Sequence, residues 1–215
     1  NLEGDRYIIS IKGKSAHAME PEKGRNAAVL LAKFLKNELE TGVGAEFVRF
    51  VTDVFDGDHT GATLGFNYYD EMSGETTLNP GIVTFNEKGG AIEVSMRYSV
   101  TYPFDEKMTE VQAHMAETPF ILDVAGDSKP HYVPEDDELV QTLLSVYQKH
   151  TNDFSKVLST GGGTYARVLK KGVAFGMLYP GELDVAHQAD EFVVVDNLLK
   201  AAAIYAEAIV KLASK

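Results

Sequence analysis

Two strand-like runs separated by four residues constrain the fold of this chain more than any other feature. Residues 76–86 and 91–100 are rich in apolar and β-branched residues, and Glu87-Lys88-Gly89-Gly90 connects them. Glycine adopts positive φ without strain, so this connection favours a tight reversal of the chain. The pattern predicts an antiparallel hairpin whose second strand ends before Pro103. A lone hairpin is only marginally stable, so other elements must cover one of its faces.

Amphipathic segments on either side of the predicted hairpin indicate helices that supply this cover. Between residues 26 and 39, apolar residues recur at steps of three and four, as in a helix packed on a sheet; they are Ala27, Leu30, Leu31, Phe34, Leu35 and Leu39. Further helices are expected at residues 47–54 and 105–117, and strands at residues 6–11 and 120–124. This order predicts an α+β unit of the split βαβ, ferredoxin-like type, with helices on an antiparallel sheet.

The composition changes between Gly126 and Pro134, where Gly, Asp, Lys and two prolines come together. Such a stretch is typical of a crossing between domains. We therefore expect one domain over residues 1–130 and a second over residues 131–215.

The second domain is expected to hold helices at residues 136–150 and 198–212 and a strand at residues 157–159. The candidate caps of its last helix are Asp196 and Asn197. This pattern predicts the C-terminal part of an α/β domain, whose sheet needs further strands to cover its edge. We expect those strands in natural sequence before Asn1, because the chain begins without Met and its first strand-like segment already starts at residue 6.

Charge and cysteine content exclude several function classes. The chain has 20 basic and 32 acidic residues, a net charge of −12, and its basic residues are dispersed. Nucleic acid and anionic membranes are therefore not expected as partners. There is no cysteine, which excludes thiolate metal sites and a cysteine nucleophile and fits the reducing cytoplasm. No apolar run approaches the ~20 residues of a membrane helix, and any metal must use His, Asp or Glu.

Two candidate residues lie in the first domain. His17 sits among small residues after a strand-like segment and before Pro21, which predicts a histidine presented on a shaped loop. Arg97 shares one strand face with Glu93, Ser95 and Ser99 and has the geometry to clamp a carboxylate. An ordinary surface histidine and an ordinary solvent-facing arginine remain the alternatives.

The second domain offers two further candidates. Gly161, Gly162 and Gly163 would let a ligand approach the backbone closely, and a helix after them would favour an anion. The alternative is a tight turn, and a phosphate loop is not supported because Thr164 follows where that motif needs Lys. His187 and Glu191 are four apart in an acidic segment that favours a cation, but two ligands do not complete a zinc site.

Four motifs in this order resemble the aminoacylase and carboxypeptidase family of two-zinc hydrolases, most closely its peptidase V or Xaa-His dipeptidase type. They are Gly-Lys-Ser-Ala-His-Ala-Met-Glu-Pro-Glu-Lys-Gly at 13–24, Ser-Met-Arg-Tyr at 95–98, Gly-Gly-Gly-Thr-Tyr-Ala-Arg at 161–167 and Ala-His-Gln-Ala-Asp-Glu at 186–191. The resemblance covers nearly the whole chain. It implies that residues 1–130 are a substrate-gripping lid inserted into a zinc-binding α/β domain, to which residues 131–215 belong.

The resemblance also implies a role for each candidate residue. His17 matches the lid histidine that donates to the developing oxyanion, and Arg97 matches the arginine that holds the C-terminal carboxylate of a dipeptide. Gly161 to Gly163 would line the same subsite with help from Arg167, and His187 matches the last metal ligand. Two zinc ions, with manganese or cobalt as other options, would activate water and polarise the scissile carbonyl.

The remaining metal ligands and the general base of that family have no counterpart in this chain. We therefore expect a fragment that is inactive alone, whose partners are a dipeptide and the missing N-terminal half, from a monomeric cytoplasmic parent. One alternative is a peptide- or amino-acid-binding module without activity. Another is an N-acyl amino-acid hydrolase of the aminoacylase type.

Overall fold

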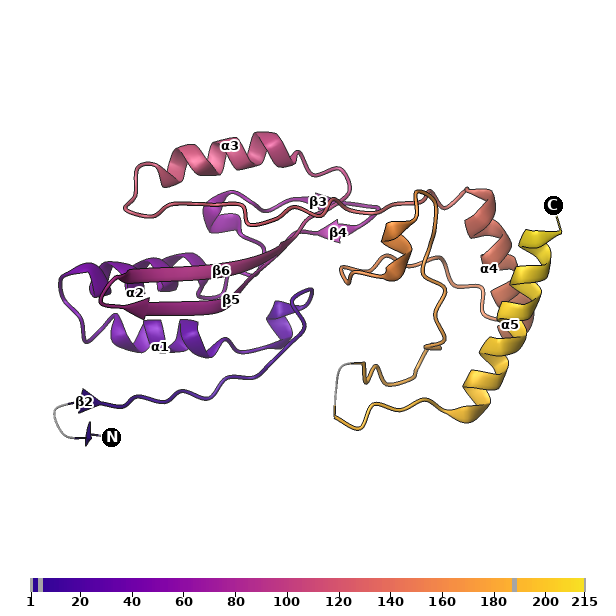
Figure 1. The fold of residues 1–215 in the computed structure, drawn as a ribbon, viewed down its shortest axis with the longest axis horizontal. Helices are drawn as coiled ribbons and strands as arrows, with labels where there is room; N and C mark the ends of the chain where they lie inside the picture. Colours follow the sequence, from indigo (N-terminus) through magenta and orange to yellow (C-terminus); the bar gives the residue numbers. More distant parts are fainter. Residues whose placement is uncertain (1, 4–5, 187–188, 215) are drawn as a thin grey trace. The chain divides into compact units, whose positions relative to one another are not determined.

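The computed structural model describes residues 2–3, 6–186 and 189–214 (Figure 1). The chain divides into two compact units, Asn1–Pro130 and His131–Lys215. Each unit has a hydrophobic core of its own.

The predicted hairpin is present and forms the centre of the first unit. Strands β5 (Thr77–Asn86) and β6 (Gly89–Arg97) pair antiparallel, with Thr77 opposite Arg97 at one end and Asn86 opposite Gly89 at the other. Gly89 has a φ of 133°, which only glycine adopts readily. Gly90 is required for packing, because a Cβ at this position would lie 2.3 Å from the ring of Phe47.

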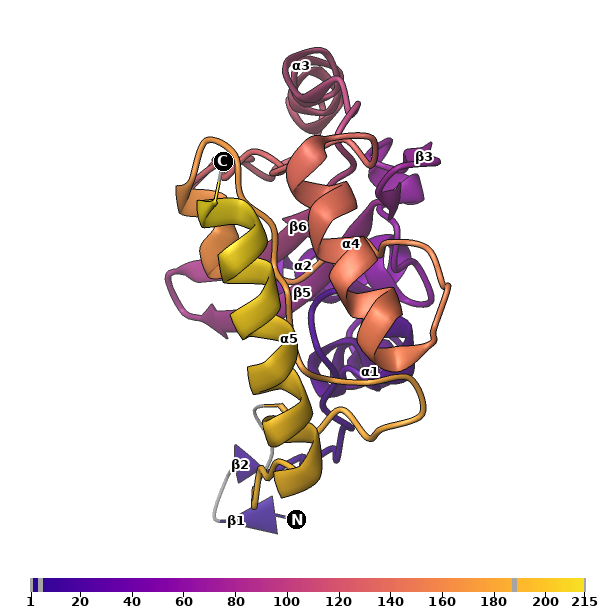
Figure 2. The same cartoon turned by 90° about the vertical axis from the view of Figure 1, so that its right-hand side faces the viewer.

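Three helices surround the hairpin, α1 (Ala27–Leu35), α2 (Val43–Phe55) and α3 (Phe104–Met115), and α1 lies alongside α2 (Figure 2). All three contribute to one core, whose buried residues are Val29, Ala32, Phe47, Val48, Val51, Val54, Phe55, Phe66, Leu78, Val111 and Met115. The Asn26 side chain caps α1, accepting from the backbone N–H of Ala28 at 3.0 Å and of Val29 at 3.2 Å. Its amide also donates to the Pro80 carbonyl at 2.8 Å, which ties α1 to β5.

The other strands of the first unit are short. β1 (Leu2–Glu3) pairs with β2 (Arg6–Tyr7), and β3 (Tyr69–Asp70) pairs with β4 (Gly74–Glu75), both antiparallel. The unit thus mixes helices with small two-stranded antiparallel sheets.

Two predicted strands of this unit were wrong in whole or in part. The strand expected at residues 6–11 is limited to β2, and residues 120–124 form no strand. The ring of Phe120 stacks on Phe50 with centroids 3.9 Å apart, so this segment is held by side-chain packing and not by a backbone ladder. No sheet of more than two strands is therefore formed by the described residues.

The second unit is built on two helices, α4 (Glu138–Thr151) and α5 (Val195–Ala213), which pack side by side in both views (Figures 1 and 2). Their shared core contains Leu143, Val146, Ile204 and Ala208. Although α5 has 19 residues, no helix in the described part of the chain has the length and apolar character to cross a membrane.

The strand predicted at residues 157–159 is absent, and no described residue of the second unit lies in a strand. A strand exists only through pairing, and Leu158 is 94 % exposed instead of covered by a neighbour. The predicted caps of α5 were also wrong by two residues. The helix begins after Val194, so Asp196 and Asn197 lie in its first turn, where the carboxylate of Asp196 complements the helix dipole.

The core of the first unit predicts how truncations in β5 affect stability. Leu78→Ala should lower the free energy of unfolding by about 2–5 kcal/mol, because Leu78 is 2 % exposed and its removal leaves a cavity. Ile82→Ala on the same strand is the matched control, since Ile82 is 52 % exposed and should cost much less. Equilibrium denaturation of both variants measures the difference, and equal losses would contradict this packing.

Candidate functional site

A closed loop carries the predicted histidine. Lys14 and Arg25 exchange two backbone hydrogen bonds, of 3.0 Å from Lys14 N to Arg25 O and 2.8 Å from Arg25 N to Lys14 O. Glycines make this closure possible, because a Cβ on Gly13 would lie 2.6 Å from the Arg25 carbonyl oxygen and one on Gly24 would lie 2.9 Å from the Ala16 Cβ. The loop between them is therefore pinned at its base.

Inside this loop, His17 is exposed and is held by its own backbone neighbours. Its carbonyl accepts from Glu20 N at 2.9 Å, and its ring Nδ1 accepts from Met19 N at 3.2 Å. The 3-10 turn η1 (Pro21–Lys23) follows, and Lys23 forms an ion pair with Glu20. The position of the imidazole is thus determined by hydrogen bonds and not by burial.

Arg97 is the last residue of β6 and is half-buried. Its partner across the hairpin is Thr77, whose hydroxyl donates to the Ala18 carbonyl at 3.3 Å. Facing Cα atoms of an antiparallel pair are about 4.5–5.5 Å apart. A single threonine therefore brings the His17 loop and the Arg97 strand position together.

Aromatic side chains pack where β6 ends. The rings of Tyr98 and Tyr102 have centroids 5.2 Å apart, those of Tyr98 and Phe104 5.1 Å, and the Tyr98 hydroxyl donates to Asp127. Burial raises the pKa of Tyr98, and its hydrogen bond to Asp127 raises it further. The predicted alternation with Arg97 does not extend to Ser99, which lies beyond the strand, is 2 % exposed and donates to the Gly74 carbonyl at 2.6 Å.

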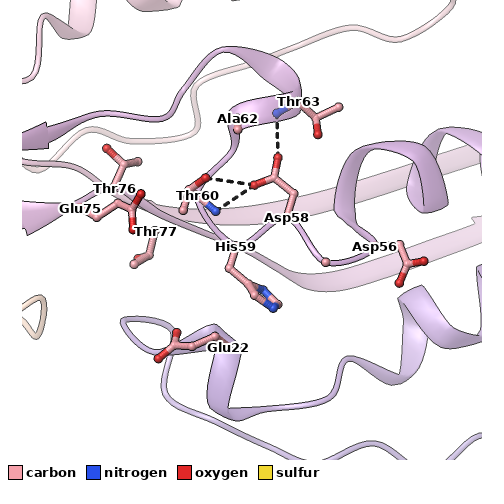
Figure 3. A pocket seen from close by; sticks show the side chains of 11 residues that line it. Glu22, Asp56, Asp58, His59, Thr60, Ala62, Thr63, Glu75, Thr76 and Thr77 are labelled. Atoms are coloured by element: carbon pink, nitrogen blue, oxygen red, sulfur yellow. Dashed lines mark hydrogen bonds between the residues drawn. The ribbon is translucent and has the colours of Figure 1, made fainter.

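A pocket of about 610 Å³ lies beside the His17 loop, lined among others by Glu22, Asp58, His59, Glu75, Thr76 and Thr77. Figure 3 shows that the Asp58 carboxylate faces its own loop, toward Thr60 and Thr63. Burial alone would raise the pKa of Asp58, but hydrogen bonds from Thr63, Thr60 and Gly61 outweigh it and lower the pKa to about 2. The ionised carboxylate of Asp58 therefore holds this loop in place through the hydrogen bonds that it accepts.

Sequence reasoning missed this pocket and the role of Thr77. The available signal was the Asp-x-Thr-Gly pattern at residues 58–61, because Asp in such a pattern accepts hydrogen bonds from following backbone N–H groups. For Thr77 no signal exists, since a threonine in a strand is ordinary.

In the second unit, the structure changes the interpretation of the glycine run. Gly161, Gly162 and Gly163 lie in a loop, and the Thr160 hydroxyl accepts from Gly162 N at 3.1 Å. The helix expected after them is only the four-residue 3-10 turn η3 (Tyr165–Val168), so the predicted favourable helix N-terminus was wrong. Arg167 does lie close to the run, because a Cβ on Gly163 would be 3.1 Å from its Nη1 atom.

His187, the predicted metal ligand, lies outside the described residues. Glu191, four positions later, is exposed. Within the described ranges, no group of three or more His, Asp or Glu side chains has the arrangement to hold a metal ion. The described residues therefore do not fit a complete metal centre by themselves.

The pattern of one known family, described as peptidase family M20/M25/M40, matches residues 16–211. The chain belongs to this family. The match includes His17, Arg97 and the glycine run, and it confirms the family predicted from the four motifs.

Three relatives illustrate the similarity of this chain to known proteins. "Putative dipeptidase YtjP" of Bacillus subtilis is 44 % identical over 99 % of this chain and 45 % of its own length. "Putative dipeptidase SSP1012" of Staphylococcus saprophyticus is 34 % identical over 95 % of this chain and 44 % of its own length. A "Putative dipeptidase" of Staphylococcus epidermidis is 34 % identical over 94 % of this chain and 43 % of its own length. The chain thus spans less than half the length of these relatives.

The Asp58 carboxylate predicts a pH-dependent contribution to stability. Because the pKa falls from 3.8 to about 2 on folding, the contribution is complete above pH 3.8 and is lost as the pH falls toward 2. Asp58→Asn should lower the free energy of unfolding at neutral pH by on the order of 1 kcal/mol, since partial exposure to water weakens the interactions of the carboxylate. Urea denaturation over a pH series measures the difference in the free energy of unfolding between the wild type and Asp58→Asn.

Asp53→Asn is the control for this experiment, because the Asp53 side chain is 60 % exposed and forms a surface ion pair with Lys36. Its effect should be small at every pH. If the stability difference between the wild type and Asp58→Asn stays constant down to pH 2, the stabilising role of the Asp58 carboxylate is contradicted.

Proposed function

We propose that this chain supplies the lid and the C-terminal part of the catalytic domain of a metal-dependent dipeptidase. Residues 1–130 are the lid and residues 131–215 the catalytic-domain segment. The observation that carries the proposal is the link through Thr77, which places the His17 loop beside the strand position of Arg97. Membership of the M20 family and the names of the relatives, each a "Putative dipeptidase", support the reaction class.

The arginine binds the free end of the substrate. A guanidinium presents parallel N–H groups that match the two oxygens of a carboxylate, so Arg97 holds the C-terminal carboxylate of a dipeptide in one orientation. The backbone of Gly161 to Gly163 and the nearby Arg167 are the other residues that we assign to substrate binding. A lid that requires this carboxylate at a fixed reach selects dipeptides over longer chains.

The histidine acts on the scissile bond. As the carbonyl carbon becomes tetrahedral, its oxygen gains negative charge, and a hydrogen bond from His17 stabilises that charge. His17 is exposed and lies on a pinned loop, which suits a group that must reach a bound substrate. This donor role makes His17 a catalytic residue in the proposal.

The metal ions, zinc by preference with manganese or cobalt as alternatives, need ligands beyond the described residues. His187 is the one ligand that we assign to this chain. The other ligands and the general base would come from the rest of a longer polypeptide, a proposal supported by relatives that are more than twice as long as the matched region. We also propose that this polypeptide completes a ferredoxin-like lid, is monomeric and is cytoplasmic.

The 215-residue chain alone should therefore show negligible dipeptide hydrolysis. The reason is the incomplete metal site, so added zinc or manganese should not restore activity. Amino-acid release from a panel of dipeptides, measured beside a longer M20 protein of the same type under identical conditions, provides the test. Sustained turnover by the chain alone would overturn the fragment proposal.

Arg97→Ala in the longer protein should raise KM for free dipeptides by roughly 10- to 100-fold, because charge-assisted hydrogen bonds to a carboxylate contribute about 1.5–3 kcal/mol. The metal content should stay unchanged. Arg49→Ala is the control, since Arg49 lies on α2 and donates to the Glu40 carbonyl at 3.1 Å. The assignment fails if both variants keep the wild-type KM, or if dipeptide amides without a free carboxylate are affected equally.

A further inference from the structure

The hydrogen bond between Met19 and His17 determines which ring nitrogen can carry the proton. Met19 N–H is a donor, and it lies 3.2 Å from Nδ1 of His17. A nitrogen that accepts a hydrogen bond must present a lone pair, and a neutral imidazole has one N–H and one lone pair. Nδ1 is thus the acceptor, and the proton must be on Nε2.

We propose that one peptide group, Ala18–Met19, sets the tautomer of His17 and makes Nε2 its donor atom. The Ala18 carbonyl accepts from the Thr77 hydroxyl at 3.3 Å, while the Met19 N–H donates to Nδ1. The two contacts act on opposite ends of the same planar unit, because C=O and N–H point in opposite directions across a trans peptide bond. Thr77 is therefore a positioning residue for His17.

The surrounding backbone keeps this peptide group in place. The His17 carbonyl accepts from Glu20 N at 2.9 Å, which closes the turn around Ala18 and Met19. The paired backbone bonds between Lys14 and Arg25 fix the base of the loop. The His17 ring itself is exposed, so its tautomer is selected by hydrogen bonding and not by packing.

A consequence follows for the proposed reaction, and this step rests on the proposed function. The residue that orients the peptide group, Thr77, is also the strand partner of Arg97. The carboxylate anchor and the oxyanion donor are then held by one residue, and the Nε2 proton is in place before substrate binds. A donor that needs no change of tautomer at the moment of reaction fits the requirement for preorganised charge stabilisation.

Nitrogen NMR of the 15N-labelled 215-residue chain reads the tautomer directly, because protonated and unprotonated ring nitrogens have different shifts and couplings. At a pH where the ring is neutral, we expect the signals of His17, assigned by their loss in His17→Ala, to show a protonated Nε2 and a bare Nδ1. A protonated Nδ1 in the wild-type chain overturns the proposal.

Two variants test the positioning role of Thr77. Thr77→Val keeps the β-branched shape and removes the hydroxyl, and we expect it to lower the fraction of the Nε2–H form of His17. Thr77→Ser keeps a hydroxyl and should retain the wild-type fraction. Equal fractions in wild type, Thr77→Val and Thr77→Ser overturn the role of Thr77.

Activity of the longer protein separates this inference from the proposed function. The amide nitrogen of Gln can stand near the position of Nε2, whereas Asn is too short to do so. His17→Asn should lower kcat by about 10²-fold, and His17→Gln should lower it less. If NMR finds the Nε2–H form but both variants keep full kcat, the tautomer assignment holds and the donor role in the proposed function is wrong.

Discussion

The pairing of β5 with β6 is the interaction on which the first unit depends. Its register places Leu78 in the core and Thr77 opposite Arg97, so the same ladder determines packing and the position of the candidate site. A slip by one residue would send every side chain to the opposite face. Gly90 allows the Phe47 ring to pack against the hairpin, which adds a side-chain constraint to the backbone register.

Local patterns in the sequence predicted the helices and the hairpin well, because their periodicity depends on residues near one another in the chain. Helix α2 was expected at 47–54 and extends from Val43 to Phe55, a difference at its ends only. The strands expected at 120–124 and 157–159 are absent, and the one expected at 6–11 is limited to Arg6–Tyr7, for one shared reason. A strand requires a partner, and partner choice is a long-range property that composition does not record.

The candidate site shows the same division. Residue type and motif order single out His17 and Arg97 as candidates, because both side chains are chemically distinctive. The peptide group between Ala18 and Met19 was not predictable, since backbone atoms are common to all residues and only three-dimensional placement gives them a role. Thr77 was missed for the same reason, because its importance comes from what its hydroxyl reaches.

The helices of the second unit leave part of its apolar surface uncovered. Apolar side chains along its connecting segments are largely exposed, among them Phe154, Leu158, Leu178 and Leu183. Extended apolar segments of this kind are typical of interior strands, and burying such area contributes about 25 cal/mol per Å². In the proposed longer protein, the rest of the catalytic domain would cover them, which would convert these segments into paired strands.

An exposed group that must act with a fixed geometry presents a physical conflict. Packing orients buried side chains, but in the proposed function His17 has to remain accessible to a substrate, so packing is not available to orient it. Each immobilised rotamer costs conformational entropy, and here that cost is met by hydrogen bonds within a loop that Lys14 and Arg25 already close. A short, locally closed loop attached at one point to a rigid hairpin therefore gives both access and orientation. This arrangement explains why the histidine lies beside β5 and not within the core.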